Sequence, residues 1–280
     1  MRVQLCPGGR KRNSRREGEN RKMGYTQQDL TAQLRAMGID PGGTVLMHSS
    51  MKKIGDVEGG ADTVLDALSG YMKDGLLVLP THTWSYINAQ NPRFHVAASP
   101  TCVGILTELF RQRPGVVRSW HPTHSVAALG RDAAAFTAGD ERFDTPCARG
   151  SAWGRLLDRE AVILLVGVDF RRNTYIHGIE EWVDIPGRMT DDHEALFTVL
   201  PDGTEIPVPS RRHCGLSWSQ HFWKVEEALE RRGAWYRGQL GDALVYVCSA
   251  VRLYEELKAM LEKDPDLFSD NEPLAPGAWD

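Results

Sequence analysis

The stretch AVILLVGVDFRRNTYIHGIEEWVDIP covers residues 161–186 and indicates a buried strand followed by a helix. Its first part, residues 161–168, is an aliphatic run of a length that suits a strand inside a sheet. Asn173 or Thr174 is placed to cap a helix that would end before Pro186, because proline cannot continue a helix. A buried strand that leads directly into a capped helix favours an α/β fold.

Within this helix, His177 precedes Glu180 and Glu181 by three and four residues. These spacings put the three side chains on one helix face. A histidine beside a carboxylate, just after a buried strand, is a candidate general base with its orienting partner. A capped surface helix with a solvated histidine has the same local pattern, so the spacing alone leaves both interpretations open.

A strand–helix–strand pattern lies nearer the N-terminus. We expect a strand over residues 44–48, a loop over 49–55, a helix that opens at 59–62 and a second strand over 76–79. The apolar residues change from a spacing of two to the spacing of a helix, which identifies this segment as a βαβ unit. Thr26 is expected to cap an earlier helix.

The remaining segments are assigned from the same kinds of pattern. After residue 186 the chain changes to an α+β pattern, with a hairpin around the turn sequence PDGT. The expected elements are a loop over 85–100, a helix over 103–112, a polar segment over 119–125 that leads into a strand, the hairpin over 197–208, a helix over 222–232, a strand over 243–248 and a helix over 251–263. The predicted class is therefore α/β with a C-terminal α+β portion.

The 280 residues are enough for one large domain with a sizeable core. We expect a disordered leader or extension over residues 1–22, because this segment is basic and polar and offers almost nothing to bury. A single domain over 23–268 and a flexible tail over 269–280 would follow, with Met23 as the start of the functional protein. A nucleic-acid-binding role for the basic leader has little support from a charge run alone.

Composition and charge exclude several classes of protein. The net charge of -4 gives no reason to expect nucleic acid as a partner, and it is compatible with a cationic ligand. The five cysteines are odd in number and include no CxxC pair, which argues against a disulfide framework or a zinc site and favours a cytoplasmic location. No apolar run reaches the roughly 18 residues of a membrane span, and no signal peptide is recognisable.

Five histidines lie in four predicted loops at the edge of the sheet. Ligands of open α/β folds bind at the carboxyl ends of the strands. The loops are 48–55, 80–84, 119–125 and 169–181, and their histidines are His48, His82, His121, His124 and His177. Four strand ends that feed one cleft would bring these side chains together.

The loop after the first strand has features of a phosphate-binding loop. Ser49, Ser50, Lys52 and Lys53 precede glycines that lead into a helix, and the amides of a helix start suit a phosphate or pyrophosphate. An ordinary polar turn before a capped helix has the same composition. Neither GxxxxGK[ST] nor GxGxxG occurs, which weighs against an ATP or dinucleotide enzyme.

No metal is predicted. His121 and His124 lack a third histidine, cysteine or carboxylate at a suitable spacing, and His121 also fits a buried residue bonded to the backbone. A serine hydrolase is disfavoured because GxSxG is absent. Asp56 and Glu58 lie near the expected cleft mouth, where they would meet a cation or remain solvated.

Five ordered segments resemble the aminoglycoside 3-N-acetyltransferase family. They are HSSMKKIG at 48–55 with VEGG at 57–60, PTHT at 80–83, HPTHSVA at 121–127, DTPC at 144–147 with GS at 150–151, and NTYIH at 173–177 with Glu180 and DIP at 184–186. The resemblance runs from about residue 26 to 260, and the shared order and spacing of the five segments make it specific.

The resemblance implies a family-specific α/β fold with a central, mostly parallel sheet. It also implies acetyl transfer from acetyl-coenzyme A to the 3-amino group of a 2-deoxystreptamine aminoglycoside, which gives antibiotic resistance. The catalytic candidates are His177, Glu180, His124 and Thr81. The coenzyme A candidates are His48, Ser49, Ser50, Met51, Lys52, Lys53, Ile54, Gly55, Thr81, Val103, Gly104 and His121. The acceptor candidates are Asp56, Glu58, His82, Trp84, His124, Glu180 and Glu181.

The expected mechanism is direct transfer in a ternary complex. His177 would take a proton from the acceptor amine while Glu180 holds the ring. Backbone amides or Thr81 would stabilise the oxyanion. The thiolate of coenzyme A needs no strong acid to leave, so Cys102 and Cys147 are not required to act.

Two departures from the family pattern leave the acceptor open. His82 stands where many relatives carry Phe, and His124 stands where classical resistance enzymes often carry a small residue beside an Asp at the Thr123 position. A non-aminoglycoside amine is therefore the second candidate acceptor. A coenzyme A-binding protein without catalysis and a metallohydrolase are further alternatives, and a homodimer is compatible with the sequence.

Overall fold

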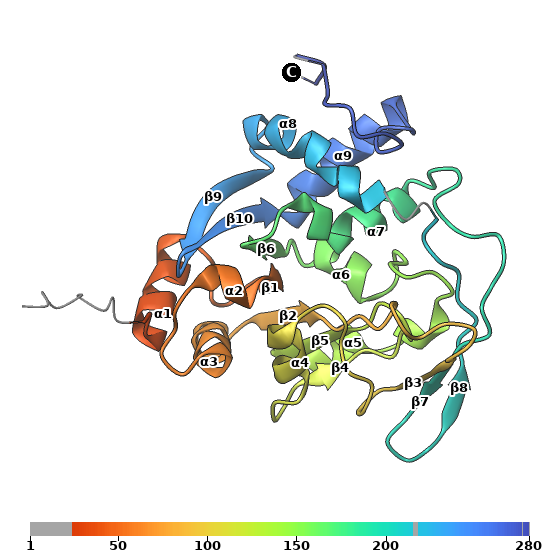
Figure 1. Cartoon of the computed structure of the whole chain (residues 1–280), viewed down its shortest axis with the longest axis horizontal. Coiled ribbons are helices and arrows are strands. Elements are labelled where there is room, and N and C mark those ends of the chain that lie inside the picture. The colour runs from red at the N-terminus through yellow and green to blue at the C-terminus, as the bar shows by residue number, and fades with distance from the viewer. Residues whose placement is uncertain (1–23, 215–217, 276, 280) are drawn as a thin grey trace, which may run out of the picture.

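A seven-stranded sheet runs through the middle of the protein in the computed structural model (Figure 1), which describes residues 24–214, 218–275 and 277–279. In spatial order its strands are β4 Val117–Arg118, β5 Val126–Gly130, β2 Leu76–Pro80, β1 Thr44–Ser49, β6 Val162–Val166, β10 Ala243–Ser249 and β9 Trp235–Leu240. The leader predicted over residues 1–22 lies outside the described residues.

The three central strands of the sheet run parallel to one another, and the two strands on each side of them pair antiparallel. β1 pairs in parallel with both β2 and β6. β5 runs antiparallel to β2, and β10 runs antiparallel to β6. β4 and β9 reverse direction once more, so β4, β2, β1, β6 and β9, five of the seven strands, point the same way. The predicted α/β class, the mostly parallel sheet and the βαβ unit are confirmed.

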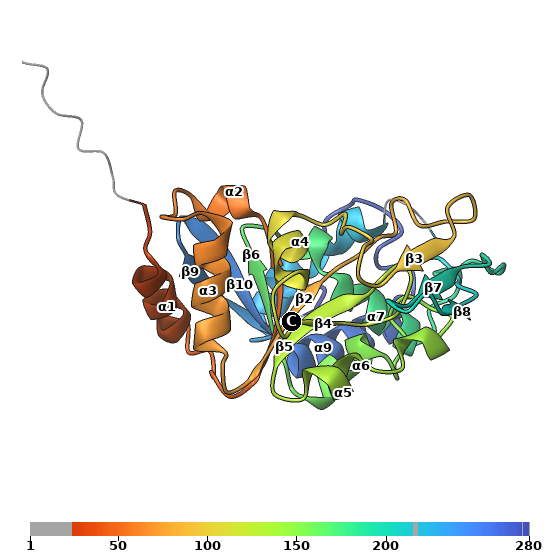
Figure 2. The ribbon, with the colours of Figure 1, turned by 90° about the horizontal axis from the view of Figure 1, so that it is seen from below.

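Helices cover both faces of the sheet (Figure 2). The buried side chains form two hydrophobic cores. Neighbouring strand residues alternate between the cores: Leu46 packs into one, while Val45 and Met47 pack into the other. The first core includes α5 Ala133–Thr137, α6 Ala152–Asp158, α7 Thr174–Trp182, α8 Glu226–Arg231 and α9 Ala250–Lys263. The second includes α1 Gln27–Ala36, α3 Ala61–Tyr71 and α4 Ile105–Arg111. Burial on both faces explains why the central strands are continuous apolar runs.

The capping residues fix where the helices begin. Thr26 Oγ1 accepts the N–H of Asp29 at 3.2 Å and the Asp29 carboxylate accepts the N–H of Thr26 at 2.9 Å, which completes a capping box before α1. Asn173 Oδ1 accepts the N–H of Tyr175 at 3.3 Å and caps α7. Both predicted caps are confirmed, and α7 ends at Trp182, ahead of the proline.

A small second sheet contains the predicted hairpin. β7 Phe197–Val199 and β8 Glu205–Pro207 pair antiparallel, which confirms it. β3 Arg93–His95 pairs in parallel with β7. The expectation of a loop throughout residues 85–100 is therefore wrong, because a three-residue strand is too short to show a pattern of its own.

Three other segments also differ from the sequence prediction. The loop over residues 49–55 contains the short helix α2 Met51–Ile54. The helix expected over 222–232 begins as the 3₁₀ helix η3 Trp218–Val225 and continues as α8. β9 was not predicted, and with β10 it extends the central sheet, so the C-terminal portion shares that sheet. The other short 3₁₀ helices are η1 Asp140–Arg142 and η2 Phe170–Arg172.

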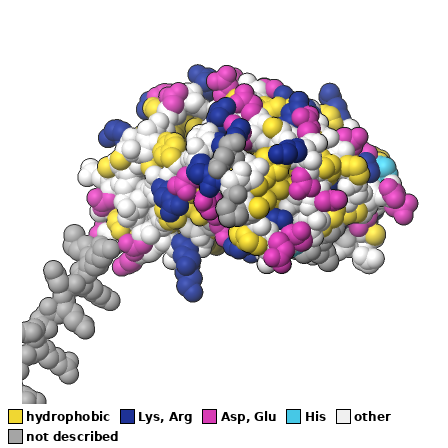
Figure 3. Space-filling model, turned by 90° about the horizontal axis from the view of Figure 1, so that it is seen from above, with side chains coloured by type: hydrophobic (Ala, Val, Ile, Leu, Met, Phe, Trp, Pro, Cys, Tyr) yellow, Lys and Arg dark blue, Asp and Glu magenta, His cyan; other side chains and the backbone are white. Residues whose placement is uncertain are grey.

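The surface in Figure 3 carries basic and acidic side chains that are interspersed over the visible face. Among the helices of the described part of the chain, none is long and apolar enough to cross a membrane.

Asp140 gives a testable dependence of stability on pH. Its carboxylate is 1% exposed and accepts the N–H of Ala152 at 2.9 Å, and burial raises the pKa of Asp140 to about 6. Because this pKa lies above the value of about 3.9 for an unfolded chain, ionisation opposes folding, and stability is lost as the pH rises from about 4 to 7. Asp140→Asn cannot ionise. Urea unfolding should show that the variant gains stability relative to wild type across this range, and a constant difference would contradict the assignment.

Candidate active site

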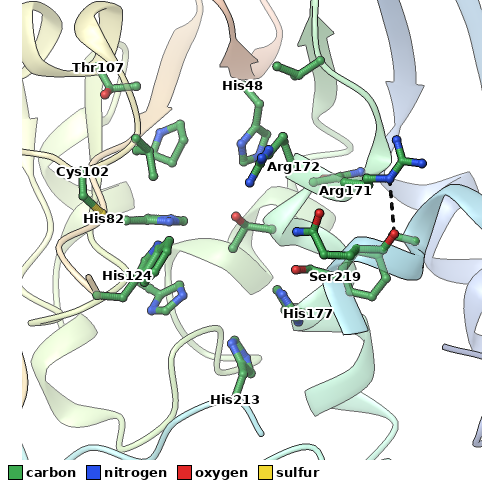
Figure 4. A pocket seen from close by; sticks show the side chains of 18 of the residues that line it. His48, His82, Cys102, Thr107, His124, Arg171, Arg172, His177, His213 and Ser219 are labelled. Carbon is green, nitrogen blue, oxygen red and sulfur yellow. Dashed lines mark hydrogen bonds between the residues drawn. The ribbon is translucent and has the colours of Figure 1, made fainter. Parts of the chain in front are cut away.

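A cavity of about 690 Å³ opens at one edge of the central sheet, where β1, β2 and β6 end. Figure 4 shows side chains from several separate segments pointing into it. The predicted residues that line it are His48, Ser49, His82, Trp84, Val103, His124 and His177. The other lining residues are Pro80, Cys102, Thr107, Val168, Arg171, Arg172, Asn173, Thr174, Arg212, His213, Ser219, Gln220 and Phe222.

Strand direction explains why these segments meet. β1, β2 and β6 are parallel, so their carboxyl ends lie at the same edge. The segment 119–125 follows β4, which points the same way as β2, and it connects β4 to the antiparallel strand β5. Since β5 is antiparallel to β2, its start lies beside the end of β2, and the N–H of Thr83 donates to the Thr123 carbonyl at 3.0 Å. This pairing brings His124 to the cavity.

His177 is held by a buried carboxylate that is itself paired. His177 Nδ1 lies 3.1 Å from Glu180 Oε2, and the Glu180 side chain is 1% exposed. Glu180 Oε1 accepts the Nε–H of Arg188 at 2.8 Å, and Arg188 also donates to the Pro265 carbonyl. A carboxylate that accepts Nδ1–H favours the tautomer whose Nε2 has a free lone pair. His177 is thus arranged to accept a proton at the cavity wall.

A second histidine–carboxylate pair lies against the first. The His213 ring stacks on the His177 ring with centroids 4.3 Å apart and an angle of 16° between the planes. His213 Nε2 lies 2.7 Å from Glu181 Oε1, which also accepts the N–H of Cys147 at 2.9 Å. Burial lowers the pKa of His213 well below its usual value and raises the pKa of Glu181 to about 7. The imidazole beside His177 is therefore neutral near pH 7.

The other cavity histidines are also neutral. Burial lowers the pKa of His48 to about 3, and it lowers the pKa of His82 and His124 well below the usual value. The Nε2 atoms of His48 and His82 have no hydrogen-bond partner among the described residues. Each of these two buried rings therefore has one nitrogen whose hydrogen-bonding capacity is unsatisfied.

His121 lies behind the cavity lining. Its Nδ1 faces the N–H groups of Thr123 and His124, at 3.3 and 3.2 Å. Burial lowers the pKa of His121 to about 3. This geometry favours the interpretation of a buried histidine bonded to the backbone over that of a metal ligand.

Several other predicted residues are not part of the lining. Thr81 is fully buried, with Oγ1 3.0 Å from Ser125 Oγ and 3.1 Å from the Arg118 Nε that donates to it. Ile54 is fully buried, and a side chain at Gly55 would collide with the carboxylate of Asp242. The predicted residues outside the lining are Ser50, Met51, Lys52, Lys53, Ile54, Gly55, Asp56, Glu58, Thr81, Gly104, His121, Glu180 and Glu181.

The sequence analysis missed the arginines of the cavity and His213. Arg171 and Arg172 lie in η2, in the segment after β6 where a ligand was expected, so their position at the cavity could have been predicted. Arg212 and His213 lie far along the chain, beyond the hairpin, and no spacing links them to α7. No Asp or Glu occurs among the lining residues in the described part of the chain.

The family model for aminoglycoside 3-N-acetyltransferase matches residues 46–262. The chain belongs to the aminoglycoside 3-N-acetyltransferase family. It is therefore an acetyltransferase, as the resemblance of its five segments implied. The acetyltransferase is 32% identical over 199 residues to aminoglycoside N(3)-acetyltransferase VII of Streptomyces paromomycinus, which covers 65% of this chain and 68% of that protein. It is 26% identical over 249 residues to aminoglycoside N(3)-acetyltransferase IV of Salmonella, which covers 87% of this chain and 90% of that protein.

Solved structures share the fold of this acetyltransferase. The aminoglycoside acetyltransferase AAC(3)-Xa superposes with a TM-score of 0.76 at 26% identity, covering 88% of this chain and 95% of that one. YokD from Bacillus subtilis superposes with a TM-score of 0.72 at 26% identity, covering 85% and 99%. AAC-IIIb, solved with CoASH, has the same fold, with a TM-score of 0.75 at 24% identity over 85% and 97% of the two chains.

The Glu180–Arg188 pair gives a prediction about stability. Removing one partner of a buried ion pair leaves an uncompensated charge and costs about 3–5 kcal/mol. We expect Arg188→Met to lower the free energy of unfolding by an amount of this order, because both side chains are almost fully buried. Adding Glu180→Gln removes the stranded charge and should restore part of the loss. Denaturant unfolding measures both effects. An Arg188→Met variant as stable as wild type would contradict the claim that Arg188 compensates the buried charge of Glu180.

Proposed function

We propose that the chain transfers the acetyl group of acetyl-coenzyme A directly to an amine, with His177 as the general base. The proposed acceptor is the 3-amino group of a 2-deoxystreptamine aminoglycoside, and the modification would give antibiotic resistance. The names of the relatives support this acceptor. The observation that carries the reaction is the His177 ring on the cavity wall, with Nδ1 3.1 Å from the buried Glu180 carboxylate.

The chemistry needs a base because an alkylamine is mostly protonated near neutral pH. His177 Nε2 takes the proton as the amine nitrogen attacks the thioester carbon. Glu180 stabilises the imidazolium that forms, and the Arg188 partner favours the ionised form of Glu180. The carbon–sulfur bond then breaks and the thiolate of coenzyme A leaves. No step requires a covalent bond to the protein.

The developing oxyanion needs hydrogen-bond donors. The hydroxyl of Thr81 is already engaged with Ser125 and Arg118, so we no longer assign this role to it. His82 and His48 line the cavity, and each can donate an Nε2–H to a ligand because that atom has no partner among the described residues. We assign the oxyanion site to these two neutral rings.

The binding of coenzyme A is proposed for the side of the cavity near β1. Ser49, the last residue of β1, lines this part, and Val103 also lines the cavity. Lys52 and Lys53 are exposed on α2, the short helix that follows β1, and Arg172 is an exposed lining residue. These cations suit the phosphates of coenzyme A. The structure of AAC-IIIb with CoASH supports a coenzyme A site in this fold.

One observation favours the second acceptor, an amine that is not an aminoglycoside. A polycation binds best where carboxylates face it. In the described part of the chain the charged lining residues are arginines, and the nearby Asp169 and Glu194 already pair with Arg171 and Arg212. Asp56 and Glu58 lie outside the lining. An acceptor with few positive charges fits such a cavity.

His177→Ala tests the proposed base. We expect the rate of thiol release from acetyl-coenzyme A to fall by about 10²-fold or more, because the proton acceptor is lost. Binding of coenzyme A, measured by calorimetry, should persist. His95→Ala is a matched control, because His95 is exposed on β3 and lies outside the lining. A His177→Ala rate close to that of wild type would remove His177 from its role.

A panel of acceptors separates the two candidate functions. It would contain gentamicin, sisomicin, apramycin and an aminoglycoside without the 3-amino group, beside simple monoamines. Rapid thiol release only with compounds that carry the 3-amino group would establish the aminoglycoside reaction. Release with monoamines, together with weak aminoglycoside activity that is insensitive to salt, would favour the second acceptor, because binding of a polycation to carboxylates is strongly screened by salt.

A further inference from the structure

Three potential metal ligands from separate segments meet behind His177. Cys147 belongs to the turn before α6, Glu181 lies on α7 and His213 follows the hairpin. Their thiol, carboxylate and imidazole ligand atoms all lie within 4.8 Å of one another. Cys147 is fully buried, and the side chains of Glu181 and His213 are 5% and 14% exposed. The sequence analysis predicted no metal here, because the three residues are far apart along the chain.

The hydrogen bonds of this cluster leave one buried oxygen without a partner. Glu181 Oε1 faces both His213 Nε2, at 2.7 Å, and the N–H of Cys147, at 2.9 Å. Glu181 Oε2 has no partner among the described residues. An unsatisfied buried carboxylate oxygen is costly, and a bound ion is one way to satisfy it. The cysteine thiol and the histidine ring nitrogen are within reach of the same ligand.

We propose that Cys147, Glu181 and His213 bind a divalent transition metal, with zinc as the preferred ion. Sulfur, nitrogen and oxygen donors of these three types are the ligands that zinc selects, and three protein ligands leave a fourth position for water. Binding requires that the thiol and His213 Nε2 lose their protons, which pass to solvent, while His213 keeps the proton on Nδ1. The site is independent of the identity of the acceptor.

The position of the cluster indicates what the metal would do. Glu181 is adjacent to Glu180 on α7, and the His213 ring stacks on His177 at 4.3 Å. A metal bound to Glu181 and His213 would fix this second ring and, through it, the orientation of His177. This positioning role rests on the proposed function of His177 as the general base, whereas the metal site itself does not.

The full chain can be tested with cobalt as a spectroscopic probe. Metal analysis of the purified protein should find zinc in stoichiometric amount. Replacing zinc with Co²⁺ should give the visible bands of a tetrahedral site and the near-ultraviolet charge-transfer band of a cobalt–thiolate bond. Cys147→Ser should remove the charge-transfer band. Cys248→Ser is the matched control, because Cys248 is an equally buried free thiol outside the cluster.

Glu181→Gln distinguishes a metal site from a hydrogen-bonded cluster. Glutamine retains an acceptor for His213 and for the backbone of Cys147, but it is a poor zinc ligand. Because outer partners of a metal already contribute about 10–100-fold in affinity, loss of a direct ligand should weaken Co²⁺ binding by at least that factor. If Cys147→Ser does not fold, the Co²⁺ affinity of Glu181→Gln still tests whether the cluster binds a metal. Wild-type protein without stoichiometric metal or a thiolate band, or a Glu181→Gln variant with unchanged affinity, would overturn the proposal.

Discussion

The carboxylate of Glu180 is the constraint on which the rest of the site depends. It is almost fully buried, and its two oxygens face His177 and Arg188. A buried carboxylate is tolerated only when such partners satisfy it. Arg188 also donates to the carbonyl of Pro265 and packs over the ring of Trp218, so the pair links α7 to segments near the C-terminus. The orientation of the base thus depends on packing that is far from it in sequence.

The mixed directions of the sheet supply the remaining parts of the site. The parallel strands β1, β2 and β6 end at one edge, and the antiparallel β5 brings the start of its strand to the same edge. Burial keeps the imidazoles of His82 and His124 neutral, so they act as hydrogen-bonding groups and not as cations. Because the Glu180 carboxylate is buried, water screens its interaction with His177 only weakly.

Local signals in the sequence predicted the elements that hold the base. The aliphatic run of β6, the Asn173 cap and the spacing of His177 to Glu180 all depend on neighbouring residues, and all three occur in the structure. Arg188 and His213 could not be predicted, because their roles follow from tertiary packing over longer separations. The antiparallel direction of β5 could not be predicted for the same reason, because a strand pattern does not show which neighbour the strand pairs with or in which sense.

The tautomer of His177 is the most direct test of this account. Nitrogen-15 NMR of histidine-labelled protein, assigned by comparison with His177→Gln, reports which ring nitrogen carries the proton. If Glu180 accepts a hydrogen bond from the ring, Nδ1 is protonated and Nε2 is free in the resting protein, and Glu180→Leu shifts this balance. A neutral ring with its proton on Nε2 in the wild-type protein would contradict the central claim, because the nitrogen left to face the cavity could not accept a proton.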